Sequence, residues 1–211
     1  MTDTRADILA ALRSKVRREQ AYPPVWQSRR KFDDLSARFA EALASVGGEV
    51  IQAESLDVAL DRLGELLHSL DAKRVVANDE PPLSECDLPA RWPEIEWHIV
   101  GRTAGDLRVF SASADVGLSG ADAALAETGS VVVSSGPGKS RLATLLPPVH
   151  VALVSTAQLA TDIFTWTAAR QKTRPASMTV ITGPSKTADI EQVLAVGVHG
   201  PRRFVVILYR A

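Results

Sequence analysis

The chain has 211 residues, enough for one α/β domain with an appendage, and its 24 Lys and Arg residues nearly balance 25 Asp and Glu residues. A formal net charge of -1 gives no global positive field that would recruit nucleic acid or an anionic membrane surface. The longest apolar runs hold only a few residues, far fewer than the roughly 20 that span a bilayer, so we expect a cytoplasmic protein without membrane insertion.

Residues 1–45 are predicted to form an N-terminal helical extension. Thr4 and Asp7 make a capping pattern before a helical apolar face, and a tandem Pro pair ends that helix. Its outer face is basic and is either a solvated surface or a docking surface for a partner. A second helix is indicated by apolar residues at helical spacing from Phe32 to Val46, with Gly47 as a left-handed stop.

From residue 46 to residue 211, strand and helix patterns alternate, which predicts a mostly parallel sheet flanked by helices. A helix capped by Ser55 follows the first strand, and a later helix capped by Ser155 or Thr156 runs to about residue 170. Residues 109–118 hold strand-like pieces, and residues 121–126 are helix-prone. Strands are expected at residues 49–53, 74–77, 95–100, 130–134, 149–154, 178–181 and 204–209.

Cysteine chemistry is limited to Cys86, which lies in a Pro-rich surface excursion at residues 79–93. One thiol forms no internal disulfide and cannot supply the roughly four thiolates that an iron–sulfur cluster needs. No His or second Cys stands at metal-ligand spacing, and the G-x-G-x-x-G fingerprint of dinucleotide sites is missing from the sequence. We therefore expect neither a metal site nor a cofactor in this chain.

Glu127, Thr128 and Gly129 stand directly before the strand at 130–134. A carboxylate beside a glycine at the edge of a sheet is placed for acid, base or nucleophilic chemistry, because the glycine lets a substrate approach closely. A capping or ion-paired glutamate fits the same spacing. Glu127 is therefore a candidate catalytic residue, and Thr128 and Gly129 are candidate substrate-binding residues.

The run Gly-Pro-Gly-Lys-Ser-Arg at residues 136–141 ends like a phosphate-binding P-loop, but Val133 stands where that motif requires its first glycine. Lys139 and Arg141 are candidate anion-binding residues, and a solvated hairpin-like loop is the alternative. His150, in the next strand, is interpreted as a core histidine.

A run rich in ligand-binding residue types follows the strand at 178–181. We expect it at the carboxyl edge of a strand, where α/β folds bind ligands, with Gly183 bringing its backbone close to an anion. Ser185, Thr187 and Asp189 are candidate anion-binding residues, and one of them would cap a short helix whose free N–H groups face that anion. His199, in a turn, is the best acid–base candidate of the four histidines. A strand-to-helix turn without a ligand is the alternative.

Three runs carry a resemblance to a known family: Ala-Glu-Thr-Gly-Ser at 126–130, Gly-Pro-Ser-Lys-Thr-Ala-Asp-Ile-Glu at 183–191, and Gly-Val-His-Gly-Pro at 197–201. Over roughly residues 45–211 the chain resembles the LUD-domain proteins of the lactate-utilisation LutC/YkgG type. The resemblance implies a fold similar to the NagB/RpiA/CoA-transferase group and a role in oxidising L-lactate to pyruvate beside iron–sulfur partner proteins. In the distantly similar CoA-transferases, a glutamate before a glycine-containing turn is the nucleophile, an analogy that favours Glu127.

Three functions stay open at this point. The resemblance favours a component of a cytoplasmic L-lactate oxidation system whose iron–sulfur clusters lie in partner subunits. The second is a free-standing enzyme for an acyl, phosphorylated or CoA-linked small molecule, with Glu127 as nucleophile or base and the Gly183 loop holding a small anionic ligand. The third is a non-enzymatic ligand-sensing or assembly subunit that docks through its basic N-terminal helix.

Overall fold

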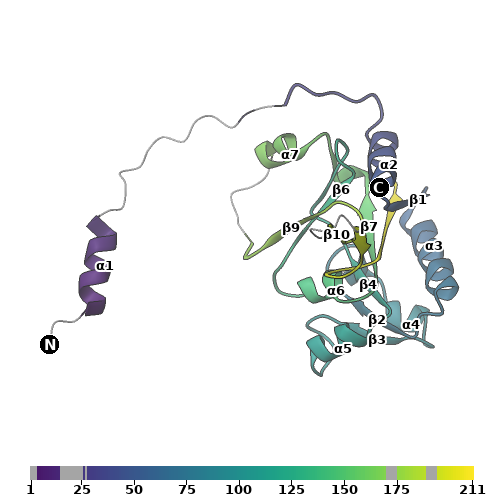
Figure 1. Ribbon diagram of the computed structural model, residues 1–211. Coiled ribbons are helices and arrows are strands. Elements are labelled where there is room, and N and C mark those ends of the chain that lie inside the picture. The colour runs from purple at the N-terminus through teal and green to yellow at the C-terminus, as the bar shows by residue number, and fades with distance from the viewer. Residues whose placement is uncertain (1–3, 15–25, 27, 170–174, 189–193) are drawn as a thin grey trace.

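A six-stranded parallel sheet forms the centre of the computed structural model, which describes residues 4–14, 26, 28–169, 175–188 and 194–211 (Figure 1). The order of the strands is β1-β12-β7-β4-β2-β3, and each neighbouring pair is parallel. The prediction of a mostly parallel sheet is confirmed. The strands are β1 (Glu49–Ala53), β2 (Arg74–Ala77), β3 (Glu96–Ile99), β4 (Val116–Ser119), β7 (Val149–Ser155) and β12 (Arg203–Tyr209).

One face of this sheet is covered by helix α3 (Leu56–Ser69), the 3₁₀ turn η1 (Leu83–Glu85) and helix α4 (Leu88–Arg91). As predicted, Ser55 caps α3, its hydroxyl accepting a hydrogen bond from Val58 N at 3.3 Å. Leucines of α3, such as Leu63 and Leu67, pack on alternate residues of the strands. Strands β7 and β12 are buried on both faces, which explains their nearly continuous apolar sequence.

The opposite face is covered by helices and by a second sheet of order β8-β5-β6-β9. In β6, Val131 and Val133 pack toward the main sheet, whereas Val132 packs outward with Trp166. The second sheet is thus a middle layer with apolar residues on both faces. Its strands are β5 (Ala123–Leu125), β6 (Ser130–Ser134), β8 (Leu159–Ala160) and β9 (Met178–Ile181), and the helices are α2 (Leu35–Ser45), α5 (Leu107–Ser113), α6 (Arg141–Leu145) and α7 (Ile163–Ala169).

The connections that follow the neighbouring strands β2 and β4 lie on opposite faces of the parallel sheet. The chain leaving β2 crosses on the face that carries α3, whereas the chain leaving β4 crosses on the face that carries the second sheet. Such a change of face opens a crevice between the carboxyl ends of the two strands, and α/β folds commonly bind ligands there. Residues 78–80 and 120–122 therefore lie at a position favoured for function.

The N-terminal extension contains a helix, as predicted. Helix α1 (Thr4–Ser14) lies apart from the α/β body in Figure 1, and its Ile8 and Leu12 side chains are more than half exposed. Helix α2, which we assigned to the same extension, buries Phe39 and Leu43 against the main sheet. The boundary at residue 45 stays a prediction.

In two segments the structure has a strand where we expected a helix, or a helix where we expected a strand. Residues 123–125 form β5 instead of a helix, because Ala123 pairs with Val132 of β6 and the segment is fully buried. Of the strand-like stretch expected at residues 109–118, only its end is a strand, β4, whereas residues 109–113 belong to α5. Asp106 accepts hydrogen bonds from Arg108 N and Val109 N and starts this helix.

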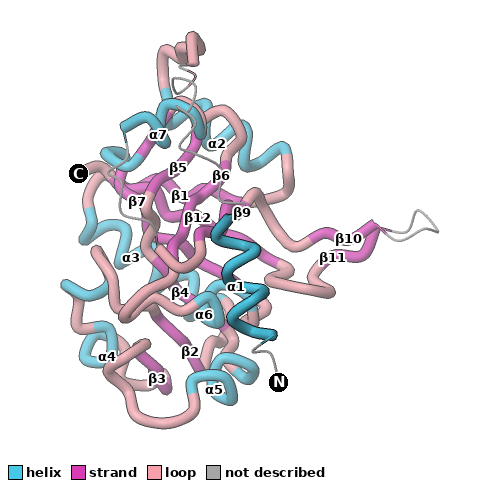
Figure 2. Tube along the Cα trace, turned by 90° about the vertical axis from the view of Figure 1, so that its left-hand side faces the viewer, coloured by secondary structure: helices cyan, strands magenta, loops and turns pink. Residues whose placement is uncertain are grey.

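Two helix starts also differ from the prediction. Ser155 caps only the short 3₁₀ turn η2 (Thr156–Gln158), and the following helix α7 begins at Ile163. After Gly183 the described chain forms strand β10 (Lys186–Ala188) instead of a short helix. It pairs with β11 (Leu194–Val196) in a hairpin that projects from the body in Figure 2.

Candidate functional site

The loop that contains Gly183 and Ser185 follows β9 of the second sheet, not a strand of the parallel sheet. Gly183 has a φ of +85°, and a Cβ there would lie 3.0 Å from the carbonyl oxygen of Val46, so the backbone requires glycine. Ser185 N donates a hydrogen bond to Pro201 O at 2.9 Å, and Gly197 N donates one to Ser185 O at 2.8 Å. These bonds hold the run at 183–191 beside the run at 197–201.

The two runs line one cavity of about 280 Å³, which we call the histidine cavity after His150 and His199. Gly183 and Ser185 also line it, and Leu145 and Phe204 belong to its apolar wall. His150 and Phe204 are the second residues of β7 and β12, so the cavity lies at the amino ends of the parallel strands. The structure thus brings Gly183, Ser185 and His199 together, but at the edge opposite the usual ligand-binding edge of α/β sheets.

His150 is fully buried in the wall of this cavity. Its Nε2 lies 2.9 Å from the hydroxyl of Ser119, and its ring stacks on Phe204 with centroids 5.1 Å apart. Burial lowers the pKa of His150 from its ordinary 6.5 to about 3, because a buried imidazolium loses its hydration. The ring is therefore neutral, and its Nδ1 has no hydrogen-bond partner within the described part of the chain.

The structure does not give the side chains of two other predicted residues of this run. Asp189 lies outside the described residues. For Thr187 the structure gives the backbone, which pairs with Ala195 in the β10–β11 hairpin. The proposed anion-binding roles of both residues stay predictions.

Glu127 lies in the turn between β5 and β6. Its carboxylate forms an ion pair with Arg30, and its backbone N donates a hydrogen bond to Thr161 O at 2.9 Å. Gly129 has a φ of +65°, and a Cβ there would lie 2.2 Å from Leu43 N. The close approach of α2 therefore explains this glycine without a substrate.

Thr128 connects this turn to the Gly183 loop through hydroxyl groups. Its Oγ1 lies 2.6 Å from Ser130 Oγ, which lies 2.7 Å from Thr182 Oγ1, directly before Gly183. This chain of hydroxyl groups does not bring Glu127 to the histidine cavity, because Glu127 is not among the residues that line it.

Lys139 lies over the crevice between the carboxyl ends of β2 and β4. Its Nζ is 3.0 Å from Glu80 Oε2 and 3.4 Å from Asp122 Oδ1. Burial lowers the pKa of Lys139, but the hydrogen bond and charge of Glu80 and the charge of Asp122 outweigh it and leave the pKa raised. An anion at this position would compete with two carboxylates for the ammonium group. Arg141 is exposed at the first position of α6.

Glu80 and its neighbours form a buried polar cluster that sequence reasoning missed. Only 5% of Glu80 is exposed, and it accepts hydrogen bonds from Asn78 Nδ2 and Gly120 N at 3.2 Å each. The available signal was the position of Asn78 and Glu80 directly after β2 and of Asp122 shortly after β4. Polar residues at the carboxyl ends of neighbouring strands meet when those strands pair.

Most predicted site residues thus lie in three places: the histidine cavity, the Glu127 turn and the β2–β4 crevice. Arg141 is on α6, the Thr187 backbone is in the β10–β11 hairpin, and Asp189 is outside the described residues. Within the described ranges, no group of three or more His, Cys, Asp or Glu residues is placed to hold a metal ion. Over the same ranges, the helices are too short or too polar to cross a membrane.

Comparison with known proteins gives consistent matches over most of the chain. The sequence pattern of the LUD domain matches residues 36–209. A protein named lactate utilization protein C from Halalkalibacterium halodurans is 30% identical over 199 residues, covering 88% of this chain and 86% of that protein. A protein of the same name from Bacillus subtilis is 30% identical over 208 residues, covering 90% and 85%.

A solved structure supports the fold. The crystal structure of a DUF162 family protein from Deinococcus radiodurans superposes with a TM-score of 0.58 at 18% sequence identity, covering 83% of this chain and 96% of that one. At that identity the likeness concerns the fold alone.

Proposed function

Because the chain belongs to the LUD-domain family, we propose that it takes part in lactate utilisation, as a component of a cytoplasmic system that oxidises L-lactate to pyruvate. The observation that carries the proposal is the match to proteins named lactate utilization protein C over 85% or more of their length. The oxidation removes two electrons and two protons from lactate. Histidines of this chain can move protons, but its one cysteine cannot hold a cluster for the electrons. The proposal therefore includes iron–sulfur partner proteins.

The histidine cavity is the place where we propose that the chain binds a small organic acid. A volume of about 280 Å³ is near the lower end of small-molecule pockets, which suits a short acid better than a dinucleotide. Phe204 and Leu145 would pack on the carbon chain, the Ser185 hydroxyl would donate to the carboxylate, and exposed His199 would exchange a proton.

Growth on L-lactate tests this function. A deletion strain without another lactate dehydrogenase should fail to grow on L-lactate as sole carbon source, and the wild-type chain should restore growth. His199→Ala should not restore growth, whereas Arg108→Gln, an exposed change on α5 far from the cavity residues in sequence, should restore it. Glu127→Gln in the same strain tests whether the predicted carboxylate matters for chemistry. Normal growth of the deletion strain would contradict the proposal.

Gentle affinity purification tests the proposed partners separately. A tagged chain taken from cells grown on L-lactate should carry a protein that contains iron and acid-labile sulfide. If growth depends on the chain but no such protein accompanies it, the role in lactate utilisation stands and the iron–sulfur partnership is wrong.

A further inference from the structure

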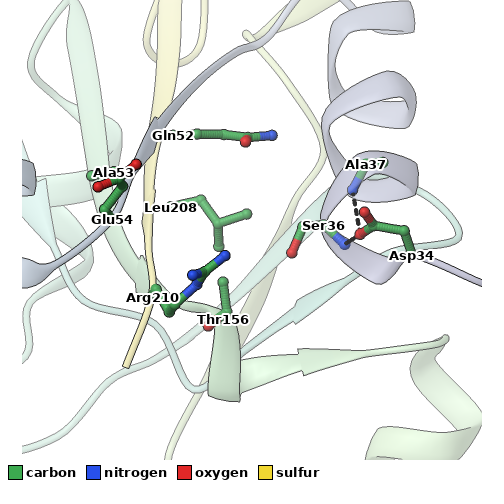
Figure 3. Close-up of a pocket in the computed structure, with 9 residues that line it drawn as sticks. All are labelled: Asp34, Ser36, Ala37, Gln52, Ala53, Glu54, Thr156, Leu208 and Arg210. Atoms are coloured by element: carbon green, nitrogen blue, oxygen red, sulfur yellow. Dashed lines mark hydrogen bonds between the residues drawn. The ribbon is translucent and has the colours of Figure 1, made fainter.

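We propose that a second cavity, at the carboxyl ends of β1 and β12, binds an organic molecule that carries an oxyanion next to hydroxyl groups. The cavity has a volume of about 660 Å³ and lies between these strand ends and the first turn of α2 (Figure 3). It lies at the other end of the sheet from the histidine cavity, at the edge where α/β folds usually bind ligands. This binding site is independent of the function proposed above.

Arg210 supplies the positive charge of this cavity. Its side chain forms no hydrogen bond or ion pair with the described residues, whereas Arg203, at the other end of β12, is bound to both carboxylate oxygens of Glu49 at 2.6 and 2.7 Å. Figure 3 shows the Arg210 guanidinium directed into the space between β12 and α2. The backbone N of Arg210 donates to Ala53 O at 3.1 Å, which fixes the residue at the strand end. An unpaired guanidinium binds a carboxylate or phosphate through two parallel N–H···O bonds.

Three neutral side chains complete the polar lining: Gln52 of β1, Ser36 of α2 and Thr156 after β7. In Figure 3 the Gln52 amide and the Ser36 hydroxyl extend into the space in front of Arg210. Within the part of the chain that the structure describes, these three side chains form no hydrogen bonds, so their donors and acceptors are available. Amide and hydroxyl groups both donate and accept, which matches the alcohol groups of a ligand.

The carboxylates that line the cavity do not neutralise Arg210. Asp34 accepts hydrogen bonds from Ser36 N at 2.8 Å and from Ala37 N at 3.0 Å as the N-cap of α2. Figure 3 shows Glu54 turned away from Arg210, and the described ion pairs include none between Arg210 and either acid. The guanidinium is therefore free to pair with an anion from outside the chain.

The lining also narrows the class of ligand. The described lining residues include no aromatic side chain, so a nucleobase would have no ring to stack on. The apolar lining is limited to Ala37, Ala53 and Leu208, while the volume greatly exceeds that of a three-carbon acid. A molecule of sugar size fits these limits, with either a carboxylate or a phosphate as its oxyanion.

Calorimetric titration of the full chain with D-gluconate, D-glucose 6-phosphate, D-glucose and inorganic phosphate tests the site. We expect gluconate or glucose 6-phosphate to bind, and neutral glucose not to bind. Binding of gluconate alone identifies a carboxylate as the natural oxyanion, and binding of glucose 6-phosphate alone identifies a phosphate. If inorganic phosphate binds as tightly as glucose 6-phosphate, the cavity does not contact the hydroxyl groups of the ligand and that part of the proposal is wrong.

Matched variants locate the binding. Arg210→Gln should weaken the affinity by about tenfold or more, because it removes a charge-assisted pair. Arg108→Gln removes an exposed arginine elsewhere and should leave the affinity unchanged, and so should His199→Ala in the other cavity. Failure of both anionic probes to bind, or equal affinity in Arg210→Gln, would overturn the proposal.

Discussion

At the scale of single residues, His150 places an ionisable ring where water does not reach it. The buried ring contacts Ser119 and Phe204, and it stays neutral down to a pH near its lowered pKa of about 3. The unfolded chain, in contrast, binds a proton at this residue below about pH 6.5. The difference makes the stability of the fold depend on pH.

The stabilising effect of neutral His150 should be fully present above pH 6.5 and should be lost as the pH falls toward about 3. Between pH 6.5 and about pH 5, wild type should lose about 1–2 kcal/mol more of its free energy of unfolding than His150→Gln. Urea unfolding at several pH values measures this difference. His68→Gln, an exposed change on α3, should keep the pH dependence of wild type. Parallel curves for wild type and His150→Gln would contradict the prediction.

Gly129→Ala should destabilise the fold by at least about 2 kcal/mol, because the new methyl group combines a positive φ with a clash against α2 backbone. Gly136→Ala is the matched control, since its Cβ would meet no atom within 4 Å and its φ is not in the left-handed region. The control should change the free energy of unfolding by less than about 1 kcal/mol. Equal effects of the two changes on urea unfolding would show that α2 does not hold the turn closed.

At the scale of elements, the first turn of α2 depends on one side chain. Asp34→Ala removes the acceptor for Ser36 N and Ala37 N and should cost about 1 kcal/mol of unfolding free energy. Asp34→Ser keeps an N-cap acceptor and should restore most of that loss. If chemical denaturation gives the same midpoint for Asp34→Ala and wild type, the cap does not limit stability.

Elements with a clear local pattern were predictable from the sequence. The helix at α3 and the strands β1 and β2 follow from regular apolar spacing, a Ser cap and β-branched runs. Strand β5 was missed because its Ala-rich sequence favours a helix, while pairing with β6 and burial decide the outcome. The helix expected after Gly183 was wrong at residues 186–188, which pair with the next strand, β11, instead.

The candidate site was predictable in its residues but not in its position. Residue types identified Gly183, Ser185 and His199, which share a cavity. That this cavity lies at the amino ends of β7 and β12 depends on how the second sheet packs, which local sequence does not encode. The contact of His150 with Ser119 likewise joins residues of two different strands.

At the scale of the whole molecule, the two helices of the predicted extension differ in burial. The apolar side chains Ile8 and Leu12 of α1 are exposed, whereas those of α2 belong to the core. Removal of α1 should therefore leave the core of the body intact.

Deletion of residues 1–24 should leave the melting temperature of the body within about 2 °C of wild type, because the large buried side chains of the described residues all come later in the chain. Thermal unfolding followed by circular dichroism measures this shift. Pull-down with the same truncated chain then tests docking: loss of the partner without loss of stability assigns docking to α1. A fall in melting temperature of 5 °C or more, by order of magnitude about 1 kcal/mol, would instead make the extension part of the fold.

The position of β12 also constrains how the protein is made. This strand lies between β1 and β7 in the sheet, although β1 is the first strand along the chain and β12 is the last. During synthesis on a ribosome, β1 therefore waits without its neighbour until nearly all described residues have been translated. Pairing across such a sequence separation is slow, since the loop-closure entropy is lost before the contacts form. The nascent chain consequently exposes the edge of β1 for most of translation and that of β7 from its own synthesis until β12 emerges, and holding chaperones should bind it during that interval.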